Sequence, residues 1–150
     1  MLVIDSSAVL GALLPDEAGT DLDTLFEPYD EIVAPWLMWA EVRNILLVAE
    51  RRGRLAAGLV EDILEALHDL GIALDQTPRS AAVLRLARRH QLSVYDALYL
   101  ELALHQEADL ATHDQALRRA AIAEGIRLAL DPTPSGQPSA GNQRLRPSAP

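Results

Sequence analysis

Short apolar segments with the character of buried strands alternate with helical segments along most of the chain. Strands that are joined through helices pair in parallel, since a tight turn can join only antiparallel strands. Parallel sheets are normally covered by helices on both faces. The alternation therefore predicts an α/β fold around a central parallel sheet.

Apolar spacing and the residues that interrupt each run give the expected elements. Strands are expected at residues 1–5, 31–34, 109–112 and 126–130. Helices are expected from Ser6 or Ser7 onward and at residues 20–26, 36–52, 56–70, 80–90, 94–106 and 114–124. Three of these helices are predicted to end at glycines, namely Gly53, Gly71 and Gly125.

The composition changes near the end of the chain. A length of 150 residues favours one domain. Five of the nine prolines lie within residues 131–150, among serines and glycines. Such a segment has little apolar surface to bury. We therefore expect one domain over residues 1–130 and a disordered tail over residues 131–150.

Residue types that are missing exclude several kinds of chemistry. The chain has no cysteine, which excludes disulfides, thiolate nucleophiles and cysteine zinc sites. It has no lysine, which excludes Schiff bases and a P-loop lysine. No apolar run is long enough to span a membrane, and no secretory signal precedes the first strand. These features predict a cytoplasmic protein that does not associate with membranes.

The charge balance is strongly acidic. The formal net charge of −9 argues against binding nucleic acid through the overall field of the protein. The basic residues are all arginine, and Arg51, Arg52 and Arg54 cluster at a predicted helix end. Positive charge suits a helix C-terminus, so we interpret this cluster as solvated charge, with phosphate contact as the alternative.

Four acidic residues occur at the edges of apolar elements, where an unpaired charge is costly. They are Asp5, Glu41, Asp96 and Asp114. Each has a simpler explanation, as a helix cap for the aspartates or as a solvated helix residue for the glutamate. Only a shared cation explains all four together, and carboxylates favour Mg²⁺ or Mn²⁺.

General topology places part of this group on one edge of the sheet. Ligands of parallel α/β sheets lie at the carboxyl ends of the strands, where Asp5 and Asp114 are expected. Ser7 and Thr112 offer hydroxyl groups near that edge. Asn44 shares a helix face with Glu41 and could support it. The four histidines have no ligand spacing, although His113 adjoins Asp114.

Four motifs resemble those of PIN-domain ribonucleases, particularly VapC-type toxins of bacterial toxin–antitoxin pairs. The motifs contain the four acids in the order of that family. They are VIDSSAVL at 3–10, WAEVRN at 39–44, LSVYDALYL at 92–100 and LATHDQAL at 110–117. The resemblance covers residues 1–130 and implies a three-layer α/β/α sandwich with a central parallel sheet of about four to five short strands.

The resemblance also implies a function and partners. The activity would be Mg²⁺- or Mn²⁺-dependent endoribonucleolytic cleavage, with Asp5, Glu41, Asp96 and Asp114 as metal ligands and catalytic residues. RNA would be the substrate, a cognate antitoxin the protein partner, and a homodimer or a toxin–antitoxin hetero-oligomer the assembly.

For the antitoxin, we expect a groove built from apolar residues of the first helices. These would be Val9, Leu13 and Leu25. Trp36 and Trp39 are expected in the core or as interface anchors.

Other functions remain open at this stage. A haloacid-dehalogenase-like phosphatase or a response-regulator receiver also places Asp after the first strand, but both use a lysine that this chain lacks. A PIN-fold protein that binds partners without catalysis is a second alternative. DNA is a third, since metal-assisted hydrolysis does not need a 2′-hydroxyl.

Overall fold

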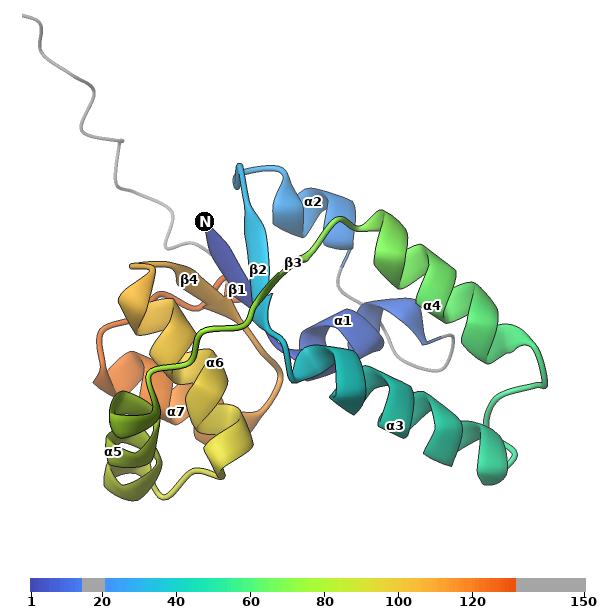
Figure 1. Cartoon of the computed structure of the whole chain (residues 1–150). Helices are drawn as coiled ribbons and strands as arrows, with labels where there is room; N and C mark the ends of the chain where they lie inside the picture. Colours follow the sequence, from blue (N-terminus) through green and yellow to red (C-terminus); the bar gives the residue numbers. More distant parts are fainter. Residues whose placement is uncertain (15–20, 132–150) are drawn as a thin grey trace, which may run out of the picture.

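The computed structural model describes residues 1–14 and 21–131, drawn as the coloured parts of Figure 1. The predicted tail after Asp131 and the predicted helix start at Thr20 lie outside the described residues. The described part has a parallel sheet with helices on both faces, which confirms the predicted fold class.

The sheet has four strands. They are β1 (Leu2–Ile4), β2 (Ile32–Pro35), β3 (Ala73–Asp75) and β4 (Asp109–Ala111). Their spatial order is β3-β2-β1-β4, and every pair is parallel. All three side chains of β1 are fully buried, which suits a central strand of a parallel sheet. Burial of each such side chain contributes about 1.5–3 kcal/mol.

The helices form the two outer layers. They are α1 (Ser6–Leu13), α2 (Leu22–Phe26), α3 (Met38–Arg51), α4 (Leu59–Asp69), α5 (Ser80–His90), α6 (Val94–His105) and α7 (Gln115–Ala123). In Figure 1, α1, α3 and α4 lie on one side of the strands, and α5, α6 and α7 lie on the other. The mostly apolar helix α6 packs against β1, β2 and β4, and α5 covers α6.

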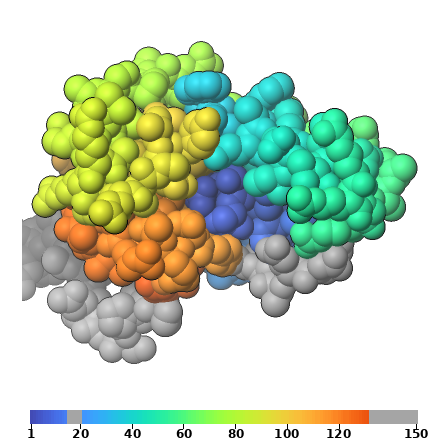
Figure 2. Space-filling model, turned by 90° about the horizontal axis from the view of Figure 1, so that it is seen from below, coloured from blue at the N-terminus to red at the C-terminus, as the bar shows by residue number. Residues whose placement is uncertain are grey.

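The strand order has one switch point. From β1 the chain adds β2 and then β3 on one side, and β4 later pairs with the other side of β1. Ligands of parallel sheets bind where the order reverses, at the carboxyl ends of the strands. Figure 2 shows that edge, with the dark blue N-terminal residues surrounded by teal α3, yellow α6 and the orange segment that includes α7. The edge between β1 and β4 is therefore the place to seek a site.

One predicted strand is absent, and one observed strand was not predicted. Residues 126–130 form no strand: their contact with the sheet is an isolated bridge between Leu128 and Leu110. The strand β3 was not predicted, because it has only three residues, none of them buried. An exposed edge strand this short has no apolar alternation from which to predict it.

The predicted antitoxin groove was also wrong in part. Val9 and Leu25 are buried in the core, and Leu13 packs partly against it. By contrast, Trp36 and Trp39 are 47% and 55% exposed, so neither belongs to the core.

Among the residues described, no helix has the length and apolar character that a membrane crossing requires.

Candidate active site

Asp5 follows β1 directly and occupies the N-cap position of α1, yet its side chain makes no capping hydrogen bond. Its carboxylate instead accepts hydrogen bonds from three hydroxyl groups. These come from Ser6 Oγ at 3.2 Å, Ser7 Oγ at 2.6 Å and Thr112 Oγ1 at 2.7 Å. Asp5 is 6% exposed. Helix capping therefore does not explain this acid, whose side chain is held toward the end of β4.

Hydroxyl groups connect the ends of β1 and β4. Thr112 is fully buried directly after β4, and its Oγ1 accepts the backbone N–H of Asp114 at 3.0 Å. Ser7 Oγ accepts the backbone N–H of His113 at 3.0 Å. The Ser7–His113 bond and the Thr112–Asp5 bond each join segments that are more than a hundred residues apart in the sequence, and the hydroxyls of Ser7 and Thr112 both donate to Asp5 Oδ2.

Glu41 lies in the first turn of α3, which begins soon after β2. Its Oε2 accepts a hydrogen bond of 2.5 Å from the Tyr99 hydroxyl. The Tyr99 ring is buried in α6, and a buried tyrosine normally finds a partner for its hydroxyl. Helix α6 therefore orients an acid that belongs to α3.

Helix α6 begins at Val94, as predicted, and its N-cap is Ser93, so Asp96 is not the cap of this helix. Ser93 Oγ accepts the Asp96 backbone N–H at 3.0 Å and donates to Asp96 Oδ2 at 2.7 Å. This pair of bonds makes Ser93 the N-cap, but it is not a capping box, in which the acid accepts the backbone N–H of the N-cap residue. It leaves Asp96 Oδ1 without a hydrogen-bond partner among the described residues.

Asp114 is the N-cap of α7, and its Oδ1 accepts the Leu117 N–H at 2.7 Å. The capping explanation is therefore correct for this acid, although Oδ2 has no partner within the described part of the chain.

Asn44 makes no hydrogen bond to a described carboxylate. It lines the mouth of a groove beside Ser7 instead.

The electrostatics indicate which acids lie near one another. Burial raises the pKa of Glu41 above its ordinary value of 4.5, and the charges of Asp5 and Asp96 raise it further. The hydrogen bond from Tyr99 opposes these effects. Burial, and then Glu41, raises the pKa of Tyr99, so this hydroxyl stays protonated. The charges of Asp5, directly after β1, and of Asp96 on α6 therefore act on Glu41 of α3, and none of the three acids forms an ion pair with a described basic residue.

The residues present fit a magnesium-type ion. In the described residues, no three Asp, Glu or His side chains group closely enough to enclose an ion by themselves. Mg²⁺ does not require such a cage, because it keeps several waters and uses one or two carboxylates together with substrate phosphates. The donors here are all oxygen, and the repulsion that raises the pKa of Glu41 is the kind that a cation relieves.

Sequence reasoning missed two residues that orient the acids, Tyr99 and Ser93. Tyr99 stands among leucines and alanines, so its pattern indicates only a core residue. Ser93 lies directly before the predicted helix at 94–106, and serine in that position is the recognisable sign of an N-cap.

Comparisons with known proteins identify the family and the fold. The sequence model described as "PIN domain" matches residues 2–123. Ribonuclease VapC3 from Pyrobaculum aerophilum is 32% identical over 120 residues, which cover 77% of this chain and 91% of that protein.

Two crystal structures share the fold. PAE2754 from Pyrobaculum aerophilum has a TM-score of 0.63 at 20% identity, covering 85% of this chain and 88% of that one. FitAcB from Neisseria gonorrhoeae has a TM-score of 0.58 at 16% identity, covering 85% of this chain and 96% of that one. The family match and the identity to a curated relative confirm the resemblance seen in the motifs: the chain belongs to the PIN-domain family.

Proposed function

We propose that this protein is a Mg²⁺- or Mn²⁺-dependent endoribonuclease and the toxin of a toxin–antitoxin pair. The observation that carries the proposal is the convergence of Asp5, Glu41 and Asp96, without a basic partner among the described residues, at the switch point of a PIN-family sheet. The similarity to a protein named Ribonuclease VapC3 supports RNA as the substrate.

The proposed metal ligands are Asp5, Glu41 and Asp96, with Asp114 completing the site directly or through water. A bound divalent ion stabilises charge on the attacked phosphate and lowers the pKa of a water nucleophile. Asp114 suits a role through water, because one of its oxygens caps α7 and the other has no described partner.

The remaining residues orient these carboxylates. Ser7 and Thr112 hold one oxygen of Asp5, which leaves the other with the weaker contact from Ser6. Tyr99 holds Glu41, and Ser93 holds Asp96. A fixed ligand geometry lowers the cost of assembling the site. Since the chain has no lysine, any cationic contact of the protein to phosphate must come from arginine or histidine.

Cleavage of matched oligonucleotides tests the function. Single-stranded RNA should be cut in Mg²⁺ or Mn²⁺, and the cut should disappear in EDTA and return when the metal is restored. The matched DNA should stay intact. Equal cleavage of DNA would change the substrate class. No cleavage of any RNA, including total cellular RNA, would favour the alternative of a PIN-fold interaction protein.

The proposed partner is a basic antitoxin segment that places a cationic side chain among the acids. Association of this protein with the co-encoded antitoxin should slow as salt increases, because complementary charge raises the rate at which the two proteins meet. The Asp5→Asn, Asp96→Asn double variant should lose most of this salt dependence. Stopped-flow association at low and high salt measures both effects, and an association rate that responds to neither would exclude the acids as the contact.

Exposed Trp36 and Trp39 replace the buried first-helix residues as candidate apolar anchors of that interface.

A further inference from the structure

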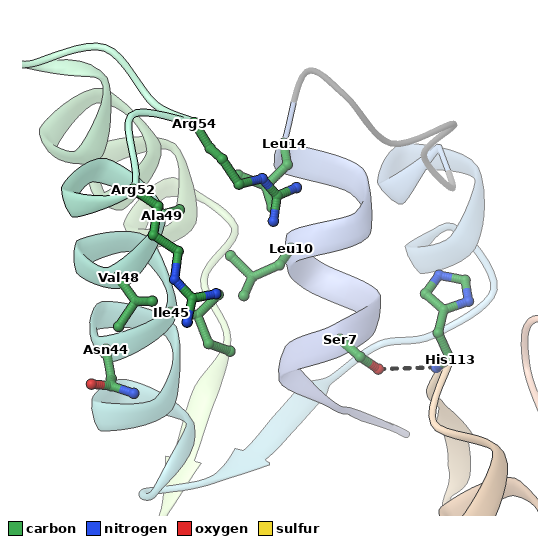
Figure 3. A pocket seen from close by; sticks show the side chains of 10 residues that line it. All are labelled: Ser7, Leu10, Leu14, Asn44, Ile45, Val48, Ala49, Arg52, Arg54 and His113. Atoms are coloured by element: carbon green, nitrogen blue, oxygen red, sulfur yellow. Dashed lines mark hydrogen bonds between the residues drawn. The ribbon is translucent and has the colours of Figure 1, made fainter.

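A groove of about 410 Å³ runs between α1 and α3 and opens beside the acidic site (Figure 3). Its middle is apolar, with side chains from both helices. They are Leu10 of α1, Leu14 directly after that helix, and Ile45, Val48 and Ala49 of α3. The end beside the site is formed by Ser7, Asn44 and His113, and the dashed line in Figure 3 marks the bond between Ser7 Oγ and the His113 N–H. Because Ser7 also binds Asp5, the groove and the acidic site share a residue.

Two arginines form the other end of the groove. Arg52 and Arg54 lie at the C-terminus of α3 and direct their guanidinium groups toward α1 in Figure 3. Along α3, positions 41, 44, 48 and 52 lie on one face, so a single stripe leads from Glu41 to Arg52. At 1.5 Å of rise per residue, that stripe is about 16 Å long.

The backbone turn after α3 fixes both arginines. Gly53 adopts a positive φ of 69°, its N–H bonds to the Glu50 carbonyl, and the Arg54 N–H bonds to the Ala49 carbonyl. This is the Schellman motif, which ends helices at glycine. It places Arg52 and Arg54 on either side of the turn in a defined arrangement. Both arginines are exposed at this helix end, as predicted, and they also line the groove.

The charge of the groove differs from that of the chain. The sequence has 22 acidic residues against 13 arginines, yet none of the described residues that line the groove is acidic. The arginine ion pairs within the described residues involve Arg79, Arg89, Arg118 and Arg127. On this acidic protein, the formal charges among the described lining residues are positive, and the groove meets the acidic site at Ser7, which binds Asp5.

We propose that this groove binds the RNA strand on one side of the cleaved phosphate, with Arg52 and Arg54 contacting phosphates further along the strand. The proposal rests on the proposed function. Arginine forks match phosphate oxygens in geometry and charge, and the apolar middle offers contact for ribose and base faces. Phosphate contacts position a strand without reading its sequence.

The charge favours RNA over a peptide as the occupant. Every nucleotide carries a negative charge, so any strand that leaves the acidic site along the groove brings phosphates to the arginines. A peptide would need acidic residues at the matching positions.

The double variant Arg52→Ala, Arg54→Ala tests the proposal in the full-length protein. KM for a long single-stranded RNA should rise about tenfold, with kcat little changed, because the lost contacts bind substrate and transition state alike. The slope of log affinity against log salt should fall by about 0.7 for each lost phosphate contact. Binding can be measured by fluorescence anisotropy with RNAs shortened from either end. The double variant should weaken binding only of RNAs that extend far enough on one side of the cleaved phosphate to reach Arg52.

The matched control is Arg85→Ala, Arg88→Ala, which removes the same charge from exposed positions on α5. It should leave KM and the salt slope at wild-type values.

If wild type cleaves RNA and both double variants behave alike, the groove proposal is wrong while the proposed function stands. Loss of antitoxin binding with unchanged RNA binding would assign the groove to the protein partner and overturn the proposal. A wild type that neither binds nor cleaves RNA would instead remove the proposed function.

Discussion

Replacement of Asp5 by asparagine is expected to lower RNA cleavage in Mg²⁺ by about a thousandfold or more, because ion binding contributes several kcal/mol to the transition state. The fold should survive the change. The asparagine Oδ1 can accept from Ser7 and Thr112, and its amide can donate to Ser6 Oγ, so all three hydroxyl contacts have a counterpart. Initial cleavage rates over a Mg²⁺ titration measure the loss.

The matched control is Asp30→Asn. Asp30 is exposed just before β2, at the opposite edge of the sheet, and loses the same charge when substituted. Wild-type activity is expected for this control. If Asp5→Asn also cleaves RNA at the wild-type rate in Mg²⁺, the assignment of Asp5 as a metal ligand is wrong.

Stability provides an independent readout of the same substitution. The raised pKa of Glu41 means that the folded state binds this proton more tightly than the unfolded chain does. The contribution of Glu41 to the free energy of unfolding therefore falls as the pH rises from 4.5 through the raised pKa, and it stays lower at neutral pH. Removing the Asp5 charge lowers the pKa of Glu41 and reduces this loss.

Without metal, Asp5→Asn should thus melt at or above the wild-type temperature at neutral pH, and its advantage should shrink as the pH falls below 4.5. Mg²⁺ should raise the melting temperature of wild type, since it binds the folded state, and should raise that of Asp5→Asn much less. Thermal melts with Mg²⁺ and with EDTA measure both effects.

Topology explains how much of this site could be predicted from sequence. Asp5 follows a strand, so the direction of that strand assigns it to the carboxyl edge before any packing is known. Glu41 and Asp96 lie on helices, and the rotation of a helix depends on its tertiary packing. Their place at the same edge follows from the start of α3 just after β2 and from the burial of α6 against the sheet.

Other features depend on contacts between distant segments and leave no local pattern. Tyr99 is an aromatic residue in an apolar helix, and only its meeting with α3 makes its hydroxyl a partner for Glu41. The strand β3 pairs with β2 although none of its side chains is buried. Arg52 and Arg54 are exposed at the end of α3, as predicted, but only the packing of α3 beside α1 makes them part of a groove. Packing therefore decides where the supporting residues act.

Thr112→Val should affect both stability and cleavage, since the fully buried hydroxyl serves two groups at once. It donates to Asp5 Oδ2 at 2.7 Å and accepts the Asp114 N–H at 3.0 Å. Valine keeps the branched shape but leaves both groups without this partner. We expect a loss of about 1–3 kcal/mol in the free energy of unfolding. Cleavage should fall about 10- to 100-fold, as it does when partners of metal ligands are removed.

Two further variants separate orientation of Asp5 from a general loss of packing. Thr112→Ser retains the hydroxyl while removing the methyl group, so it should keep most of the activity and of the Mg²⁺ affinity. Thr24 lies on α2, remote from the acids, and its exposed hydroxyl donates to Asp21, the N-cap of that helix. Thr24→Val removes this hydroxyl and should leave cleavage unchanged. Mg²⁺ titrations monitored by melting temperature report whether Thr112→Val weakens metal binding. If Thr112→Val unfolds more easily but binds Mg²⁺ and cleaves RNA like wild type, Thr112 stabilises the fold alone, and the orientation of Asp5 must depend on Ser6 and Ser7.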